Sequence, residues 1–337
     1  MQILAIETSC DETAVAIYQS DGMAGRIIAE RVASQIETHA KFGGVVPEVA
    51  SREHLKVLPA MVEDVMNSAG LDWKQIDHIA VTSGPGLMGA LLVGVSYARA
   101  LGTVNKIPVI PVHHMEGHLL APGLSEEGLP DFPFITLLVS GGHTLLVRVD
   151  GIGKYSVIGR TIDDAAGECF DKSARLLGLP YPGGPEISRL AGNGDANRFK
   201  LPRPLLNQDN LNFSFSGLKT AVMYAVKNHG EMDSVAKADM AAAIEAAICD
   251  VLVKKSLRSC SKEGVNRLVI AGGVAANRTL RSLLEESASK EGVRVYLPHP
   301  KYCTDNAAMI AYAASSRLTN KLTIPEHWDV QPRWPLG

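Results

Sequence analysis

The sequence feature that most constrains the fold is a unit of two short apolar strands joined by a polar bend, which occurs twice in the chain. In the first copy, apolar residues at 3–6 and 14–18 flank the bend ETSCDET. In the second copy, residues 134–139 and 145–149 flank the bend SGGHT. Short strands separated by small and polar residues form hairpins. Their recurrence predicts an internal structural repeat, with one copy in each of two lobes.

Helical patterns lie between and after these hairpins. The stretches that begin at Ser51 and Gly86 fit helices, and HIAVTSGPG reads as a strand that ends in a turn. Residues 268–271 predict another short buried strand, followed by a glycine turn and an amphipathic helix from Asn277. Alternation of strands and helices is typical of the α/β class, in which helices cover mixed or parallel sheets.

The length of the chain favours two domains. At 337 residues, the chain exceeds the roughly 250–300 residues at which a single hydrophobic core stops growing. The stretch LSEEGLPDFP combines proline, glycine and charge, as connections between domains do. We therefore expect the boundary near residue 131.

Charge and cysteine content exclude several classes of protein. The 33 basic and 36 acidic side chains give a net charge of -3, so an RNA partner would be held by a local patch or with help from another subunit. The five cysteines form no C-x-x-C pair, which argues against a disulfide framework or a zinc ribbon. No basic signal segment and no apolar stretch of the ~20 residues that a membrane span needs is present. These features predict a cytoplasmic protein with no membrane partner.

The segment PVHHMEGH carries a candidate metal site. On a helix, His114 and His118 lie four positions apart on one face, a spacing that suits two ligands of one metal ion. An exposed histidine pair on a helix surface is the alternative. A zinc protease motif, H-E-x-x-H, needs a glutamate directly after the first ligand, whereas Met115 stands there and Glu116 comes one residue later. Glu116 should project away from the ligand face, which argues against a metalloprotease.

A third metal ligand must come from elsewhere in the chain. The segment CTDNAAMIAYAA offers Asp305 at the start of an apolar helix. Aspartate and asparagine are also ordinary N-cap residues, so this cluster could serve only to cap the helix. The sequence leaves both readings open.

Three glycine-bearing bends could bring backbone amides close to a phosphate or a nucleoside. They lie at residues 140–142, 183–184 and 272–273, and the third opens a helix at Asn277, whose amide side chain can form paired hydrogen bonds. The fingerprint G-x-G-x-x-G is absent, which argues against a dinucleotide site of the Rossmann type.

Charged residues near these bends have both functional and structural readings. Asp171 and Lys172 could contact a ligand, whereas Asp163 and Asp164 could simply complement a helix dipole. The segment RFKLPRP supplies three cations that would suit phosphate contacts if RNA is a substrate, although such clusters are often only loops.

Many ordered motifs together resemble one family. The motifs are MQILAIETSCDET, GGVVPEVASREH, GPGLMGALLVG, PVHHMEGH, LLVSGGHT, IDDAAGECFDK, YPGGP, FSFSGLKT, GGVAANRTLR and CTDNAAMIAY. From residue 1 to about residue 315 they look like the tRNA threonylcarbamoyladenosine transferase family. The resemblance implies an α/β fold like that of actin, hexokinase and Hsp70, with two lobes, each built on a mixed five-stranded sheet, around a ligand cleft. We expect an N-terminal lobe at 1–131 completed by a helix at 304–320, a C-terminal lobe at 132–303 and a tail at 321–337.

The resemblance also implies a reaction and a set of site residues. The reaction would transfer a threonylcarbamoyl group from threonylcarbamoyl-AMP to the N6 amine of the adenosine 3' of the anticodon, in tRNAs that read codons beginning with A. One divalent ion, Fe²⁺ or alternatively Zn²⁺, would lie in the cleft. Ser188 departs from several bacterial relatives, which have an acid there, and this puts a ribose contact in doubt. The implied residues are His114, His118 and Asp305 for the metal; Leu138, Val139, Ser140, Gly141, Gly142, Asp171, Gly184 and Asn277 for the adenylate; and Asp11 and Glu12 as catalytic acids or bases.

The resemblance further implies two protein partners, a catalytically inactive paralogue of the same fold and a small P-loop ATPase. Three alternatives compete with the transferase. A metalloprotease would hydrolyse peptides, a non-catalytic actin-like scaffold would bind nucleotide and partner proteins only, and a sugar or acetate kinase would leave the histidines without a role.

Overall fold

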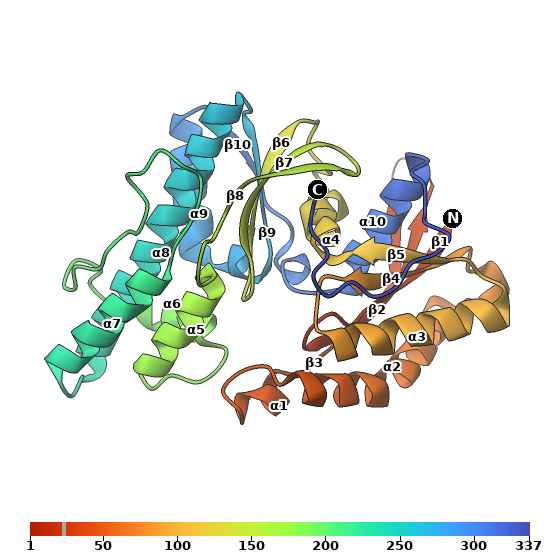
Figure 1. The fold of residues 1–337 in the computed structure, drawn as a ribbon, viewed down its shortest axis with the longest axis horizontal. Coiled ribbons are helices and arrows are strands. Elements are labelled where there is room, and N and C mark those ends of the chain that lie inside the picture. The colour runs from red at the N-terminus through yellow and green to blue at the C-terminus, as the bar shows by residue number, and fades with distance from the viewer. Residues whose placement is uncertain (22–24) are drawn as a thin grey trace. The chain divides into compact units, whose positions relative to one another are not determined.

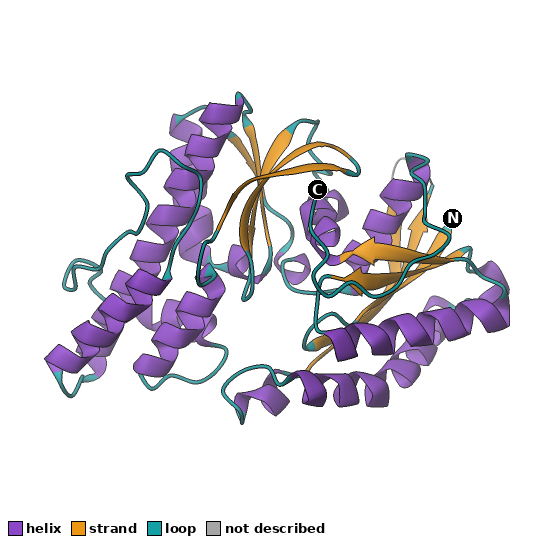
Figure 2. Ribbon diagram, in the orientation of Figure 1, coloured by secondary structure: helices purple, strands orange, loops and turns teal. Residues whose placement is uncertain are grey.

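The computed structural model describes residues 1–21 and 25–337, and the chain divides into two compact units. Unit 1 comprises Met1–Leu129, Ile152–Lys154 and Thr304–Gly337, and unit 2 comprises Pro130–Gly151 and Tyr155–Cys303. Each unit contains one five-stranded sheet with helices packed on it (Figure 1, Figure 2). Within the described part of the chain, no helix is long and apolar enough to cross a membrane.

The sheet of unit 1 is mixed and has the strand order β3-β2-β1-β4-β5. The central strand β1 pairs antiparallel with β2 and parallel with β4. Its apolar residues are fully buried, because helices cover both faces of the strand. The strands are β1 (Gln2–Glu7), β2 (Glu12–Ser20), β3 (Gly25–Ser34), β4 (His78–Gly84) and β5 (Val109–His113).

Two pairs of helices cover this sheet. Helices α2 and α3 pack on each other and on β2 and β4, whereas α4 and α10 pack on each other, and α10 also contacts β1 and β2. Figure 1 shows the two pairs on opposite faces of the sheet. Through α10, the end of the chain therefore completes the unit with which the chain begins. The helices are α1 (Ile36–Ala40), α2 (Pro47–Ala69), η1 (Trp73–Gln75), α3 (Met88–Asn105), α4 (His114–Leu120), η2 (Ala121–Leu124) and α10 (Ala307–Thr319).

The sheet of unit 2 has the strand order β10-β9-β6-β7-β8. The long helix α8 packs on β6 and β9 and between α6 and α9, and most of its residues are buried. The strands are β6 (Phe134–Val139), β7 (Thr144–Gly151), β8 (Lys154–Arg160), β9 (Arg267–Ala271) and β10 (Arg294–Tyr296). The helices are α5 (Ala166–Leu176), α6 (Gly183–Ala191), α7 (Ser216–His229), α8 (Ser234–Glu263), η3 (Gly273–Ala276), α9 (Arg278–Lys290) and η4 (Pro300–Tyr302).

The predicted internal repeat is confirmed by the two strand orders. In each sheet the first strand is central, pairs antiparallel with the next strand in the chain, and pairs parallel with a strand that returns after intervening helices. β1 to β5 thus correspond one by one to β6 to β10. The mixed α/β class predicted from the sequence is also confirmed.

Two elements differ from the sequence prediction: β3 was not predicted, and α2 starts earlier in the chain than expected. β3 is a long strand at the edge of its sheet, and its exposed polar residues, including Arg26 and Arg31, hide the apolar alternation that identifies a strand. Helix α2 begins at Pro47 rather than Ser51, because proline at the first helical position loses no intrahelical hydrogen bond.

Gly272 joins the end of β9 to η3, at a position that has no room for a side chain. Its φ is +90°, and a Cβ atom there would lie 2.4 Å from the carbonyl oxygen of Val139 on the neighbouring β6. Both the backbone conformation and the close approach exclude larger residues. The glycine therefore fixes the turn from β9 toward α9.

We predict that Gly272→Ala lowers the free energy of unfolding by about 3 kcal/mol or more, because backbone strain adds to a clash that the backbone of β6 cannot relieve. Gly264→Ala is the matched control, since Gly264 has a φ of +63° but open space around its Cβ position. The control should lose only about 1–2 kcal/mol. Urea denaturation followed by circular dichroism measures both, and equal losses would contradict the role of the close approach.

Candidate metal centre and adjoining sites

Helix α4 places two histidine rings side by side. It starts directly after β5, and His113 caps it by accepting a hydrogen bond from the Met115 backbone N–H at 3.1 Å. One turn apart, the rings of His114 and His118 are buried and lie edge to face, with centroids 4.8 Å apart. The predicted helical spacing of the two histidines is therefore present.

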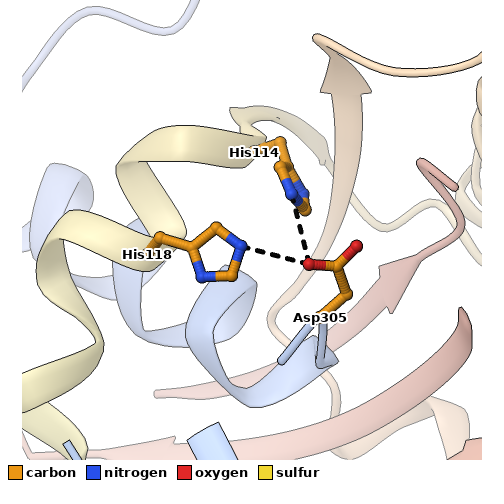
Figure 3. Close-up of side chains that lie close together, drawn as sticks. All are labelled: His114, His118 and Asp305. Carbon is orange, nitrogen blue, oxygen red and sulfur yellow. Dashed lines mark hydrogen bonds and ion pairs between the residues drawn. The ribbon is translucent and has the colours of Figure 1, made fainter. Parts of the chain in front are cut away.

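Asp305 lies against both rings (Figure 3). Its Oδ1 is 3.1 Å from Nε2 of His118 and 3.4 Å from Nε2 of His114. One donor atom from each residue lies within 4.8 Å of the others, so these three side chains form a group that could hold a metal ion. Two imidazole nitrogens and a carboxylate oxygen suit a divalent transition metal, and three protein ligands leave a coordination position open.

In the Thr-Asp-Asn cluster, the residue that caps the helix is Asn306 and not Asp305. The side chain of Asn306, not that of Asp305, accepts a hydrogen bond from the Met309 backbone N–H at 2.8 Å and caps α10. Asp305 is thus left to face the histidines. Burial opposes its ionisation, but His114 and His118 outweigh that effect and hold the pKa of Asp305 well below its usual value.

Glu7, at the end of β1, also contacts this group. Its Oε2 lies 3.0 Å from Nδ1 of His114, the ring nitrogen that does not face Asp305. Burial raises the pKa of Glu7, yet the attraction to His114 outweighs burial and lowers it overall. Sequence reasoning missed Glu7, because a polar residue that closes an apolar strand gives no signal of what it touches.

The predicted catalytic acids Asp11 and Glu12 lie in the first hairpin bend and at the start of β2. Burial, Asp305 and Asp11 together raise the pKa of Glu12 to about 9. At neutral pH, Glu12 is therefore protonated when no cation lies among these carboxylates. A cation beside Asp305 would favour the ionised form of Glu12, which is an electrostatic property expected of a cation site.

Helices α2 and α3 anchor this acidic bend. The Leu87 backbone N–H donates to the carbonyl of Ser9 at 2.8 Å, and the Thr8 hydroxyl donates to the carbonyl of Ala90 at 2.9 Å. On the other side, Nε2 of His54 lies 2.9 Å from the carbonyl oxygen of Cys10. The bend is therefore held by rigid elements, as a site that must position reacting groups requires.

Glu116 points away from the histidine pair, as its position in the helix predicts. Its buried carboxylate pairs with Arg317 of α10 at 2.9 and 3.0 Å. A glutamate held in this way cannot serve as the general base of a zinc protease acting at the histidines. The geometry thus supports the argument against the metalloprotease.

We predict that Glu116→Gln lowers the free energy of unfolding by about 1–3 kcal/mol, because it leaves the largely buried Arg317 guanidinium without its charge partner. The affinity for metal should change less than twofold. Thermal denaturation and metal titration of the same preparation measure the two effects. A large loss of metal affinity at unchanged stability would show that Glu116 belongs to the site.

In unit 2, the predicted adenylate residues lie in or beside the three glycine-bearing bends. Leu138 and Val139 end β6, and Ser140 to Gly142 form the bend into β7, where the space beside Gly141 and Gly142 is open. Asp171 of α5 accepts a hydrogen bond from the Gly183 backbone N–H at 2.8 Å and so fixes the turn that presents Gly184 at the start of α6. The bends lie at a strand end or a helix start, where the backbone N–H of Ser140 donates to the carbonyl of His143 and that of Gly183 donates to Asp171.

Asn277 is already engaged within the chain. Its Oδ1 caps α9 by accepting from the Leu280 N–H at 2.8 Å, and its Nδ2 donates to Ser188 at 2.8 Å and to Glu245 at 2.7 Å. A ligand that hydrogen-bonds this side chain must replace or share these contacts. Sequence reasoning missed Glu245, although a lone acid in the apolar run AAAIEAAI of α8 was an available signal.

Several charged residues considered for ligand binding have structural partners. Asp163 accepts hydrogen bonds from the hydroxyls of Ser214 and Ser216 and from the backbone N–H groups of Phe215 and Ser216, so its carboxylate complements the N-terminus of α7 rather than that of the helix which follows it in the chain. Arg198 pairs with Asp239 at 2.6 Å, and Arg203 pairs with Asp250 at 2.9 Å. Two of the three cations of RFKLPRP are therefore neutralised within the chain, which weakens their case as phosphate contacts.

The sequence and the fold are both similar to those of known proteins. A family model described as TsaD, tRNA N6-adenosine threonylcarbamoyltransferase, matches residues 26–312. Relatives named tRNA N6-adenosine threonylcarbamoyltransferase occur in Paracidovorax citrulli (54% identity over 339 residues, 99% of this chain and 97% of the relative) and in Albidiferax ferrireducens (53% over 349 residues, 100% and 98%). A third, from Variovorax paradoxus, is 53% identical over 341 residues and covers 100% of this chain and 97% of its own.

Solved structures with low sequence identity share the fold. Component A of (R)-2-hydroxyglutaryl-CoA dehydratase from Acidaminococcus fermentans has a TM-score of 0.53 at 15% identity, and the alignment covers 95% of this chain and 98% of that one. HypF in a phosphate- and nucleotide-bound form has a TM-score of 0.59 at 14% identity, with coverage of 95% and 46%. These similarities concern the fold alone, and they agree with the predicted actin- and hexokinase-like class.

Proposed function

Because this chain belongs to the tRNA N6-adenosine threonylcarbamoyltransferase family, we propose that it transfers a threonylcarbamoyl group from threonylcarbamoyl-AMP to tRNA. The acceptor is the N6 amine of the adenosine 3' of the anticodon in tRNAs that read codons beginning with A. The observation that carries the proposal is the identity of about half of all residues over the full length of relatives with this name.

We assign one divalent metal ion to His114, His118 and Asp305. Their donor set and burial fit Fe²⁺, with Zn²⁺ as the alternative. When bound, such an ion supplies a positive charge that polarises an oxygen atom, as Lewis acids do. The three side chains come from α4 and from the residue before the cap of α10, two elements that pack on each other, so the chain holds them in place without the ion.

We assign the removal of a proton to Asp11 or Glu12. In the transfer, a bond forms between N6 and the carbamoyl carbon, the bond from that carbon to the phosphate oxygen breaks, and AMP leaves with the electron pair. N6 must lose one proton, which an ionised carboxylate can accept. The pKa of about 9 of Glu12 allows this role only when a cation has shifted Glu12 to its ionised form.

We assign the adenylate to unit 2, at the bends that contain residues 138–142 and Gly184, with Asp171 and Asn277. The support is their geometry: backbone amides at a strand end and at helix starts bind phosphate, and the open space beside Gly141 and Gly142 admits a ligand. Asp171 acts in part by holding the Gly183 turn in place.

Partner proteins form part of the proposal. The net charge of -3 provides no general attraction for tRNA, so we expect the inactive paralogue of the same fold and the small P-loop ATPase to be needed for full activity in the cytoplasm. The scaffold alternative is less well supported, since binding nucleotide and partners would not require the group formed by His114, His118 and Asp305.

The decisive experiment mixes the chain and its partners with threonylcarbamoyl-AMP and unmodified tRNA, followed by mass spectrometry of the nucleosides. We expect threonylcarbamoyladenosine, and we expect His118→Ala to reduce its formation at least about 100-fold, because removal of one ligand abolishes metal binding. Glu116→Gln is the control on the same helix and should retain activity. Peptide hydrolysis without tRNA modification would support the protease instead.

A second experiment separates the two candidate bases. If one of them removes the N6 proton, Asp11→Asn or Glu12→Gln should lower the single-turnover rate by about 10²–10⁴-fold, while metal and tRNA binding stay unchanged. The residue whose variant shows this loss is the base. Native rates in both variants would exclude both residues.

A further inference from the structure

We propose that Glu7 is a positioning residue for the metal centre, which fixes the ring of His114 so that Nε2 faces the ion. The proposal rests on the metal site assigned above. It concerns a side chain that touches no substrate and acts through His114.

The two ring nitrogens of His114 have different neighbours. Nδ1 lies 3.0 Å from Oε2 of Glu7 and 3.2 Å from Oγ of Ser9, whereas Nε2 faces Oδ1 of Asp305 at 3.4 Å. Because an ionised carboxylate only accepts hydrogen bonds, the contact with Glu7 requires the hydrogen on Nδ1. In the neutral ring the lone pair is then on Nε2, and it points to the side where His118 and Asp305 present their own donor atoms.

The carboxylate of Glu7 is itself held from two sides. It is fully buried, its Oε2 accepts a hydrogen bond from the Thr82 hydroxyl of β4 at 2.5 Å, and its Oε1 accepts one from the backbone N–H of Ser9. These donors come from the neighbouring strand and from the bend after β1. Glu7 therefore cannot turn away from His114 without losing buried hydrogen bonds.

Charge gives Glu7 a second effect. Among the three assigned ligands only Asp305 is anionic, so a divalent ion would leave a buried site with one excess positive charge. Glu7 supplies a further negative charge without occupying a coordination position, as carboxylates that hydrogen-bond metal-ligating histidines do. Such partners commonly change metal affinity by about 10–100-fold.

His118, unlike His114, has no carboxylate beside its Nδ1. Within the described part of the chain, its Nδ1 is buried and has no hydrogen-bond partner. Packing and the contact of Nε2 with Asp305 at 3.1 Å set the orientation of this ring. Of the two histidines, His114 is thus the one whose tautomer the protein dictates.

The test is titration of metal-free protein with Co²⁺, followed by the visible absorbance of the complex. We expect Glu7→Gln to weaken Co²⁺ binding about 10–100-fold, because glutamine keeps the shape and loses the charge. Glu116→Gln is the matched control, since Glu116 is also a buried glutamate, on the same helix as His114, but pairs with Arg317. It should bind Co²⁺ within twofold of the unaltered protein.

A second readout distinguishes positioning from a merely structural role. In the Zn²⁺-loaded protein, a proton–nitrogen correlation spectrum should show a hydrogen-bonded ring N–H at Nδ1 of His114, and this signal should shift or vanish in Glu7→Gln. A folded Glu7→Gln protein with unchanged Co²⁺ affinity and an unchanged signal would overturn the proposal. If Glu7→Gln does not fold, Thr82→Val takes its place: it keeps the charge but frees the carboxylate, and it should weaken binding several-fold, whereas unchanged affinity would overturn the proposal.

The outcome separates this proposal from the proposed function. Co²⁺ binding that depends on Glu7, His114 and His118, in a protein that does not modify tRNA, would retain the positioning role and reject the transferase. Failure of the unaltered protein to bind Co²⁺ would reject the positioning role, even if tRNA is modified.

Discussion

The candidate site depends on the packing of α10 on α4 and on the sheet of unit 1. This contact brings Asp305 to 3.1 Å from His118, although the two residues are 187 positions apart in the chain. It also forms the buried pair of Glu116 and Arg317 on the opposite side of α4. This one helix interface thus completes the group of metal ligands. It also holds Glu116 in an ion pair, so that Glu116 cannot act as the general base that a metalloprotease would need. The apolar face of α10 supplies the free energy that holds these polar contacts in place.

Acidic side chains have different roles in the two units. In unit 1, Glu7, Glu12 and Asp305 concentrate negative charge around two histidines, and Glu12 is protonated unless a cation is present. In unit 2, carboxylates accept hydrogen bonds from the chain itself. Asp163 holds the segment before α7, Asp171 holds the Gly183 turn, and Glu245 holds Asn277. Acidic side chains therefore gather where a cation is expected, whereas in unit 2 they fix the turns and the helix starts where an adenylate is expected.

Much of the fold could be predicted from local patterns, and the features that were missed lack a local pattern. The hairpins and the helical spacing of His114 and His118 are local, because a few consecutive residues decide them. β3 was missed, since an edge strand with exposed charges has no apolar alternation, and Glu7 and Glu245 were missed because their roles depend on residues far away in the sequence. The sequence singles out Ser188 as a departure from the family pattern, but the contact of Ser188 with Asn277 depends on tertiary structure.

The sequence by itself determined the repeat of strand, polar bend and strand, the placement of two histidines on one helical face, and the misplacement of Glu116 for protease chemistry. Periodicity and spacing decide these features, since they require only the geometry of one strand or one helix. Tertiary structure alone decided that Asn306 caps α10 while Asp305 faces the histidines, and that Glu7 reaches Nδ1 of His114. The physical reason is that hydrogen bonds and charge interactions act over a few ångströms in space, whatever the separation of the residues along the chain.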